Sequence, residues 1–292
     1  MRKRFLVLAL AVLAVLPTAW AYDFSATSPS GHTLYYEIIS GTTNVGVVRP
    51  GTNSTYNNYV TGNVVIPDTV IYNGVTYNVT ELKTLNNNLY SGTFGNCTNI
   101  TSVTIPNSVT IIGNYAFYGC SSLTSLSIPT SVTAIGHRTF YDCSSLTSIN
   151  IPQSVTTIGA AAFAANNLTS LTVDQANTVY KSDGNSIIEI ATNTLVQACP
   201  STVIPNYIVC IGPGAFFALS GIESIEIPNS VIVIDEAAFK GLSDLVSVDI
   251  PNSVTYIGES AFENCTSLES IVIPNSVTEI GSMSFFGCDM LT

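Results

Sequence analysis

The feature that most constrains this chain is an internal repeat. Successive copies of a key phenylalanine are 23 residues apart, except for one gap of 53 residues, which equals one ordinary unit plus one of 30. Chains with such a period fold as solenoids, because a single unit buries its apolar face only by stacking on the next. The repeat predicts eight units over roughly residues 81–292. Their phenylalanines are Phe94, Phe117, Phe140, Phe163, Phe216, Phe239, Phe262 and Phe285.

The pattern inside one unit predicts a short strand followed by a turn. Leu126 and Ile128 alternate with serines, which is typical of a half-buried strand, and Pro129 ends that strand. Gly136 then turns the chain. Because Asp235 takes the glycine's place in one unit, we expect a left-handed backbone, with positive φ, at this slot.

Phenylalanine occupies its slot in all eight units. We expect each ring to stack on its copy in the next coil, where it would bury about 150–250 Å². Since no coil can bury these faces alone, stability is expected to come from the stacking of coils.

The repeat resembles the BspA-like leucine-rich repeats over about 70 % of the chain. The matching stretches include "IPNSVTIIGNYAFYGCSSLTSL" and "IPNSVTYIGESAFENCTSLESI". The resemblance implies a right-handed solenoid with parallel β-strands on one face, built of strand, loop and short turns or helical pieces. It also implies a surface-exposed protein, bacterial or from some protists, that acts in adhesion.

Residues 1–21 read as a secretory signal peptide. Three basic residues, Arg2, Lys3 and Arg4, precede a 12-residue apolar run that is too short to span a bilayer. Small residues flank Trp20, so we expect cleavage near Ala21. A protein secreted or held at the cell surface is the predicted outcome.

The chain is expected to divide into three further parts. Residues 22–80 lack the repeat and predict an N-terminal β cap, with a hairpin at Asn73-Gly74. Residues 81–292 form the repeats, and the unit at about 168–204 is extended, with a two-stranded hairpin replacing the phenylalanine arc. The repeat stops without a cap, which leaves either a short terminal arrangement or, as we favour, a fragment of a longer protein.

Charge excludes two classes of partner. The net charge is −11, and it becomes −14 once the three basic residues of the signal peptide are removed. Nucleic acid and anionic membranes both need a basic surface, so neither is an expected partner. No later segment is long and apolar enough to predict a transmembrane helix. We expect a monomer without a cofactor.

Five of the seven cysteines lie three residues after the repeat phenylalanine: Cys97, Cys120, Cys143, Cys265 and Cys288. Other units place Asn166, Leu219 and Leu242 in this slot, so we interpret it as a buried packing position. Cys199 and Cys210 lie off this pattern, and a disulfide between them is left open.

The sequence offers no pattern typical of catalysis. The two histidines, His32 and His137, lie apart from any recurring group, and no metalloprotease, hydrolase or phosphate-loop motif is present. A pocket is also hard to build on a rod whose coils touch only their neighbours. The chain is therefore predicted not to be an enzyme.

The outward positions of the strands are the candidate binding face. They are polar in the first coils and acidic in the last, where 11 acidic residues accompany one base after residue 222. This face could solubilise the protein, dock a basic partner, or loosely hold a divalent cation. The candidate residues are Ser125, Ser127, Ser148, Asn150, Glu223, Glu226, Asp249 and Glu269.

The sequence thus predicts a non-catalytic, extracellular or cell-surface module that binds or adheres to a protein or glycan partner. The alternative is a structural spacer that carries other domains at the surface.

Overall fold

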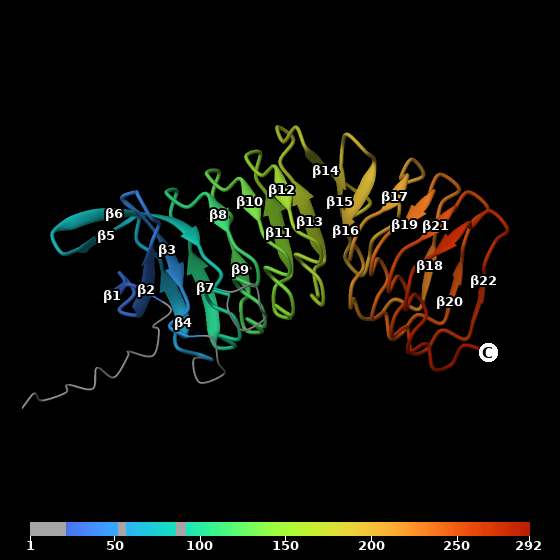
Figure 1. The fold of residues 1–292 in the computed structure, drawn as a ribbon, viewed down its shortest axis with the longest axis horizontal. Coiled ribbons are helices and arrows are strands. Elements are labelled where there is room, and N and C mark those ends of the chain that lie inside the picture. Colours follow the sequence, from blue (N-terminus) through green and yellow to red (C-terminus); the bar gives the residue numbers. More distant parts are fainter. Residues whose placement is uncertain (1–21, 52–56, 86–91) are drawn as a thin grey trace, which may run out of the picture.

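The computed structural model describes residues 22–51, 57–85 and 92–292. Over these ranges the chain forms an elongated solenoid whose coils follow one another along its long axis in sequence order (Figure 1). Every regular element described is a β-strand, and turns join the strands where helical pieces were also expected. The predicted repeat solenoid with parallel strands is confirmed. The predicted signal peptide, residues 1–21, lies outside the described residues.

The first strand of each coil contributes to a parallel ladder that we call the strand face. The strands are short because a proline follows each one except β13, and it cannot donate to the ladder. They form three groups, β4–β7–β9, β11–β13 and β18–β20–β22. Their bounds are β4 (Gly62–Val65), β7 (Ile100–Thr104), β9 (Ser125–Leu126), β11 (Ser148–Ile151), β13 (Ser170–Val173), β18 (Ser224–Glu226), β20 (Ser247–Asp249) and β22 (Ser270–Val272).

A second ladder runs along another side of the coils. Its strands, which are two residues long except for β16, pair in parallel in strict register, for example Ile112 with Ile135 and Ile135 with Ile158. It is interrupted between β12 and β16. The strands are β8 (Ile111–Ile112), β10 (Ala134–Ile135), β12 (Thr157–Ile158), β16 (Thr194–Gln197), β17 (Cys210–Ile211), β19 (Val233–Ile234), β21 (Tyr256–Ile257) and β23 (Glu279–Ile280).

The N-terminal residues form antiparallel strands that continue the second ladder. β1 (Phe24–Thr27), β2 (Thr33–Ile38) and β3 (Asn44–Val48) pair in order. β5 (Thr69–Tyr72) and β6 (Val75–Leu82) form a hairpin with left-handed Asn73 and Gly74 at its turn, as predicted, and β6 pairs in parallel with both β3 and β8. β4 already has the strand-face pairing of a coil, so the solenoid register begins before residue 80.

The repeat phenylalanines form a buried column, as expected. The rings of Phe117, Phe140 and Phe163 stack at centroid distances of 5.2 and 5.3 Å with interplanar angles of 4° and 6°. The column stops at Phe163 and begins again at Phe216. The apolar core is divided in the same region into two clusters, one reaching from residue 24 to residue 199 and the other from residue 188 onward.

The expectation of positive φ at the repeat glycine is wrong. Neither Gly136 nor Gly159 has positive φ; instead, a Cβ atom on either would lie 2.4 Å from a backbone nitrogen of the preceding coil. The slot needs glycine because the coils approach closely there. Positive φ occurs two residues later in each coil, at Tyr115, Arg138, Ala161, Gly214, Ala237, Ser260 and Met283.

The extended unit holds three strands, not the two that we predicted. β15 (Ser186–Glu189) and β16 form the expected hairpin, and β14 (Tyr180–Asp183) adds a third antiparallel strand. β14 was missed because only Tyr180 among its four residues is a large apolar side chain, so it lacks alternation. The meander occupies the break in the second ladder (Figure 1).

Gln197 joins the two halves of the solenoid across this unit. In regular coils the phenylalanine N–H donates to a carbonyl of the next coil, as Phe140 does to Ala162. Here the Phe163 N–H donates to Oε1 of buried Gln197, whose Nε2 donates to the Ala215 carbonyl. The side-chain amide therefore replaces a missing coil-to-coil hydrogen bond.

Candidate binding surfaces

The structure exposes all eight residues predicted for the binding face. Glu226 and Asp249 are direct neighbours in the parallel register of β18 and β20, and Val272 follows them on β22. Glu223 and Glu269 are kept two coils apart, because Val246 bonds to the backbone of both. The structure thus brings one acidic pair together and separates the other two carboxylates.

Serine fills one outward column of the strand face from β7 onward, while Asn63 holds this register on β4. Ser125 pairs with Ser102, and Ser148 pairs with Ser170. The column continues in the last coils through Ser224, Ser247 and Ser270. Because these positions face away from the core, packing does not explain the choice of serine.

The next outward column carries the variation between coils. It contains Ser127 and Asn150 in the first half, and the Asn150 amide oxygen accepts a hydrogen bond from the Thr172 hydroxyl at 2.9 Å. In the second half it contains Glu226, Asp249 and Val272. The face changes from neutral and polar to acidic across the interruption.

The structure gives no support to a cation site in the acidic strip, by which we mean Glu223, Glu226, Asp249 and Glu269. Among the described residues, no group of three or more His, Cys, Asp or Glu side chains is arranged to hold a metal ion. Glu226 and Asp249 alone supply two carboxylates, fewer than calcium requires.

The cysteine slot is buried as predicted, and it also has a polar role that we did not foresee. Cys97, Cys120, Cys143 and Cys265 are fully buried, and burial raises the pKa of the Cys265 thiol to about 12. The Cys143 sulfur donates to the Phe117 carbonyl of the preceding coil at 3.1 Å. In the next coil the amide of Asn166 donates to the Phe140 carbonyl in the same way. Cys199 and Cys210 are both free thiols.

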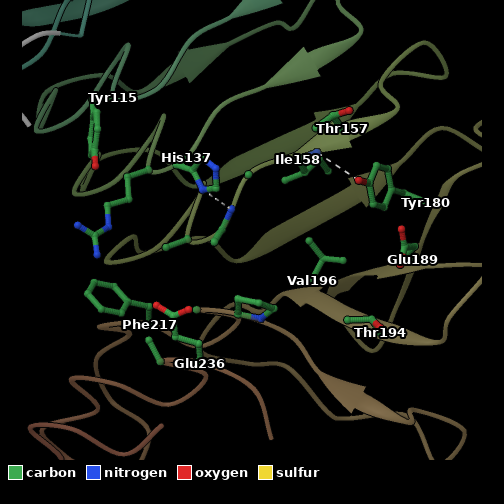
Figure 2. Close-up of a pocket in the computed structure, with 17 residues that line it drawn as sticks. Tyr115, His137, Thr157, Ile158, Tyr180, Glu189, Thr194, Val196, Phe217 and Glu236 are labelled. Atoms are coloured by element: carbon green, nitrogen blue, oxygen red, sulfur yellow. Dashed lines mark hydrogen bonds between the residues drawn. The ribbon is translucent and has the colours of Figure 1, made fainter. Parts of the chain in front are cut away.

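A pocket was expected to be hard to build on such a rod, yet the structure contains one. A pocket of about 740 Å³ opens where the extended unit separates two coils (Figure 2). Its lining comes from β12, the three inserted strands and the turns before and after them. The residues that line it include Tyr115, His137, Arg138, Thr157, Ile158, Tyr180, Glu189, Thr194, Val196, Phe217 and Glu236. The 53-residue gap in the repeat is the sequence signal that could have located this pocket.

Hydrogen bonds and ring contacts hold several of these side chains in place. The Tyr180 hydroxyl accepts the Ile158 N–H at 3.2 Å, and His137 Nδ1 accepts the Ala160 N–H at 3.1 Å (Figure 2). The Arg138 guanidinium lies 5.0 Å above the Phe217 ring. Since Nδ1 of His137 is an acceptor, the neutral ring carries its proton on Nε2 and offers a donor there.

A smaller pocket of about 410 Å³ adjoins the strand face at the same interruption. It lies between residues 202–206 and β18, and Glu226 is part of its wall. One predicted binding residue is therefore in a concave setting, while the others lie on an open surface.

The described residues contain no helix that could cross a membrane. The sequence matches the family described as "BspA type Leucine rich repeat region", with six copies over residues 56–187 and 188–292. No curated protein matches significantly.

Two solved structures share the fold. A leucine-rich repeat protein from Eubacterium ventriosum is 22 % identical with a TM-score of 0.62, covering 92 % of this chain and 78 % of its own. The pneumococcal vaccine antigen PcpA is 16 % identical with a TM-score of 0.52, covering 93 % of this chain and 87 % of its own. The family match spans most of the sequence, and the chain belongs to the BspA-type leucine-rich repeat family.

Proposed function

We propose that this protein is a non-catalytic module, secreted or held at the cell surface, that binds a protein or glycan partner along its strand face. The observation that carries this proposal is the difference between the inward and the outward positions of each coil. Inward positions repeat the same packing residues, while the outward column through Ser127, Asn150, Glu226 and Asp249 varies and is exposed. Varied side chains on a regular, rigid ladder favour recognition.

Location outside the cell rests on the leader-like residues 1–21 and on membership of the family. Without residues 1–21 the chain would be acidic, and the outward positions of its last coils carry carboxylates. Both features favour partners with basic patches over nucleic acid. Pulse-chase labelling followed by fractionation of the producing cell tests this location. Newly made protein that stays in the cytoplasm would contradict it.

Binding can be tested by exposing the purified protein to arrays of extracellular-matrix proteins and of glycans. A partner is expected whose affinity falls when the acidic strip is neutralised in the variant Glu223→Ser, Glu226→Ser, Asp249→Ser, Glu269→Ser. Each exposed charge is worth about 0.2–1 kcal/mol, so the four together are expected to lower the affinity by roughly fourfold to several hundredfold. Matched changes at Glu259 and Glu279, off the strand face, should leave binding unchanged.

A structural spacer remains the alternative, and the continuous stacking of coils along one axis favours it. A spacer needs no outward specificity. If neither array yields a partner, or if binding ignores both the acidic strip and the serine column, the spacer function is the better explanation.

A further inference from the structure

The strand face is interrupted between β13 and β18, and a side chain closes the β13 side of this break. In regular coils the residue before the strand donates its N–H to a carbonyl one coil earlier, as Val246 does to Glu223. At the break the Thr169 carbonyl, which ends this series on the β13 side, accepts the Asn185 Nδ2 group at 3.1 Å. The Asn185 amide therefore takes the place of the missing coil-to-coil donor.

The β18 side of the break has no such replacement. Glu223 precedes β18 as Val246 precedes β20, and the residue in the same slot one coil earlier is Pro200. Within the described ranges the Glu223 N–H donates to no group, and the Pro200 carbonyl accepts from none. The smaller pocket, of about 410 Å³, lies at this place, and Pro200 is part of its wall. The pocket thus has at its wall a backbone acceptor that the ladder does not use.

Apolar side chains form most of the wall of this pocket. Val203, Ile222 and Ile225 contribute to it, and Val203 is 73 % exposed. The one aromatic residue of the wall, Phe216, is buried in the core, so the pocket presents no exposed ring on which a sugar could stack. The wall is therefore suited to the aliphatic part of a side chain more than to a glycan.

The charge at this pocket is negative. Glu226 supplies a carboxylate, and no lysine, arginine or histidine is among the described residues that line the pocket. Asp249 lies next to Glu226 in the register of β18 and β20. The one base after residue 222, Lys240, is already in an ion pair with Glu263. Charge complementarity therefore favours a cationic ligand.

We propose that the smaller pocket receives an arginine side chain of a protein partner. The guanidinium donates to the Glu226 carboxylate and to the Pro200 carbonyl, and the methylene groups pack on Val203 and Ile225. Arginine fits better than lysine because its planar group presents several donors at once and is less strongly hydrated. Arginines that fill pockets are also among the side chains that contribute most to protein interfaces. This inference rests on the proposed function, because the pocket adjoins the strand face.

The probe is Nα-acetyl-arginine methylamide, titrated into the full chain with carbon-13 labels on its valine and isoleucine methyl groups. Saturable shifts of the Val203, Ile222 and Ile225 methyl signals are expected, with a dissociation constant on the order of 1 mM for a ligand of this size. The citrulline derivative has nearly the same shape without the charge and should produce no saturable shift. The lysine derivative should bind at least about threefold more weakly than the arginine derivative.

Matched variants along one outward column locate the site. Val203, Glu226, Asp249 and Val272 occupy the same slot in successive coils, and only the first two line the pocket. Glu226→Gln should weaken binding of the arginine derivative at least about threefold, while Asp249→Asn should change it less than about twofold. Val203→Ser should also weaken binding, about threefold, because the methylene groups lose an apolar contact. Val272→Ser makes the same change two coils beyond the pocket and should have no effect.

Three results would overturn the inference. They are no saturable shift of the three methyl signals with the arginine derivative, equal binding of the citrulline derivative, and equal effects of Glu226→Gln and Asp249→Asn.

Failure of this inference can be told apart from failure of the proposed function. A partner found on the protein arrays whose binding is unaffected by Val203→Ser would overturn the arginine site alone. An arginine derivative that binds in the pocket, while neither array yields a partner, would support the site and count against the proposed binding function.

Discussion

Two slots in each coil, two residues apart, are constrained in different ways. At Gly136 and its equivalents, the next coil leaves no room for a Cβ atom. Two residues later, at positions such as Ala237, the backbone is left-handed with φ near 51°, yet the side chain has space. Substitution should therefore affect stability strongly at the first slot and little at the second.

Gly136→Ala should lower the free energy of unfolding by about 1–3 kcal/mol, because the methyl group would force two coils apart. Ala237→Gly should be close to neutral, since relief of left-handed strain, about 1 kcal/mol, offsets the greater entropy of glycine in the unfolded chain. Urea unfolding of both variants gives the comparison. A stable Gly136→Ala protein would mean that the coils are less tightly apposed than described here.

The buried cysteines of the repeat should react very slowly with thiol reagents in the folded protein. Burial raises the pKa of the Cys120 and Cys143 thiols, so little thiolate forms at pH 8 and access is blocked as well. Thiol labelling of these residues should be at least about a hundredfold slower than in unfolded protein. Labelling should accelerate as the pH rises, because each raised pKa delays ionisation. Partly exposed Cys210 and Cys288 should react first; rapid reaction at Cys120 would contradict burial.

At the scale of elements, the phenylalanine column couples neighbouring coils. An internal ring such as Phe140 touches a ring on each side, at 5.2 and 5.3 Å, whereas Phe285 in the last described coil has one such neighbour, Phe262 at 5.5 Å. Position along the column should therefore set the cost of losing a ring.

Phe140→Ala should cost about 3–5 kcal/mol, the usual range for a buried phenylalanine. Phe285→Ala should cost less than half as much, since its ring is only partly buried and has one stacked neighbour. Chemical denaturation of the two variants measures both values. Equal losses would argue against stability that accumulates from coil to coil.

The regular coils could be predicted because a 23-residue pattern repeats each slot several times. Comparing what fills a slot across units identified the buried phenylalanine and cysteine columns and the outward residues. The same comparison failed at the glycine, because Asp235 suggested a backbone preference while the true constraint is contact between coils. It also failed where the repeat is interrupted, because β14, Gln197 and the pocket at the extended unit depend on contacts between segments that occur only once.

At the scale of the molecule, the extended unit separates two stacks that have their own cores. The stacks remain joined at Gln197 and by the hydrogen bond from the Ala165 N–H to the Phe217 carbonyl, at 3.3 Å. The second ladder is split at the same place, and the larger pocket, of about 740 Å³, forms in the split. A departure from the repeat thus creates a concave site on an otherwise regular surface.

Amide hydrogen exchange tests the central claim, coil-on-coil stacking, most directly. The amides of Gly136, Gly159 and Gly258 each donate to the preceding coil, at 2.8, 2.9 and 2.7 Å. Slow exchange is predicted at these glycines and at the same slot in each regular coil, so that protection recurs every 23 residues. Exchange at the rate of an unstructured peptide at these amides would contradict the stacked solenoid.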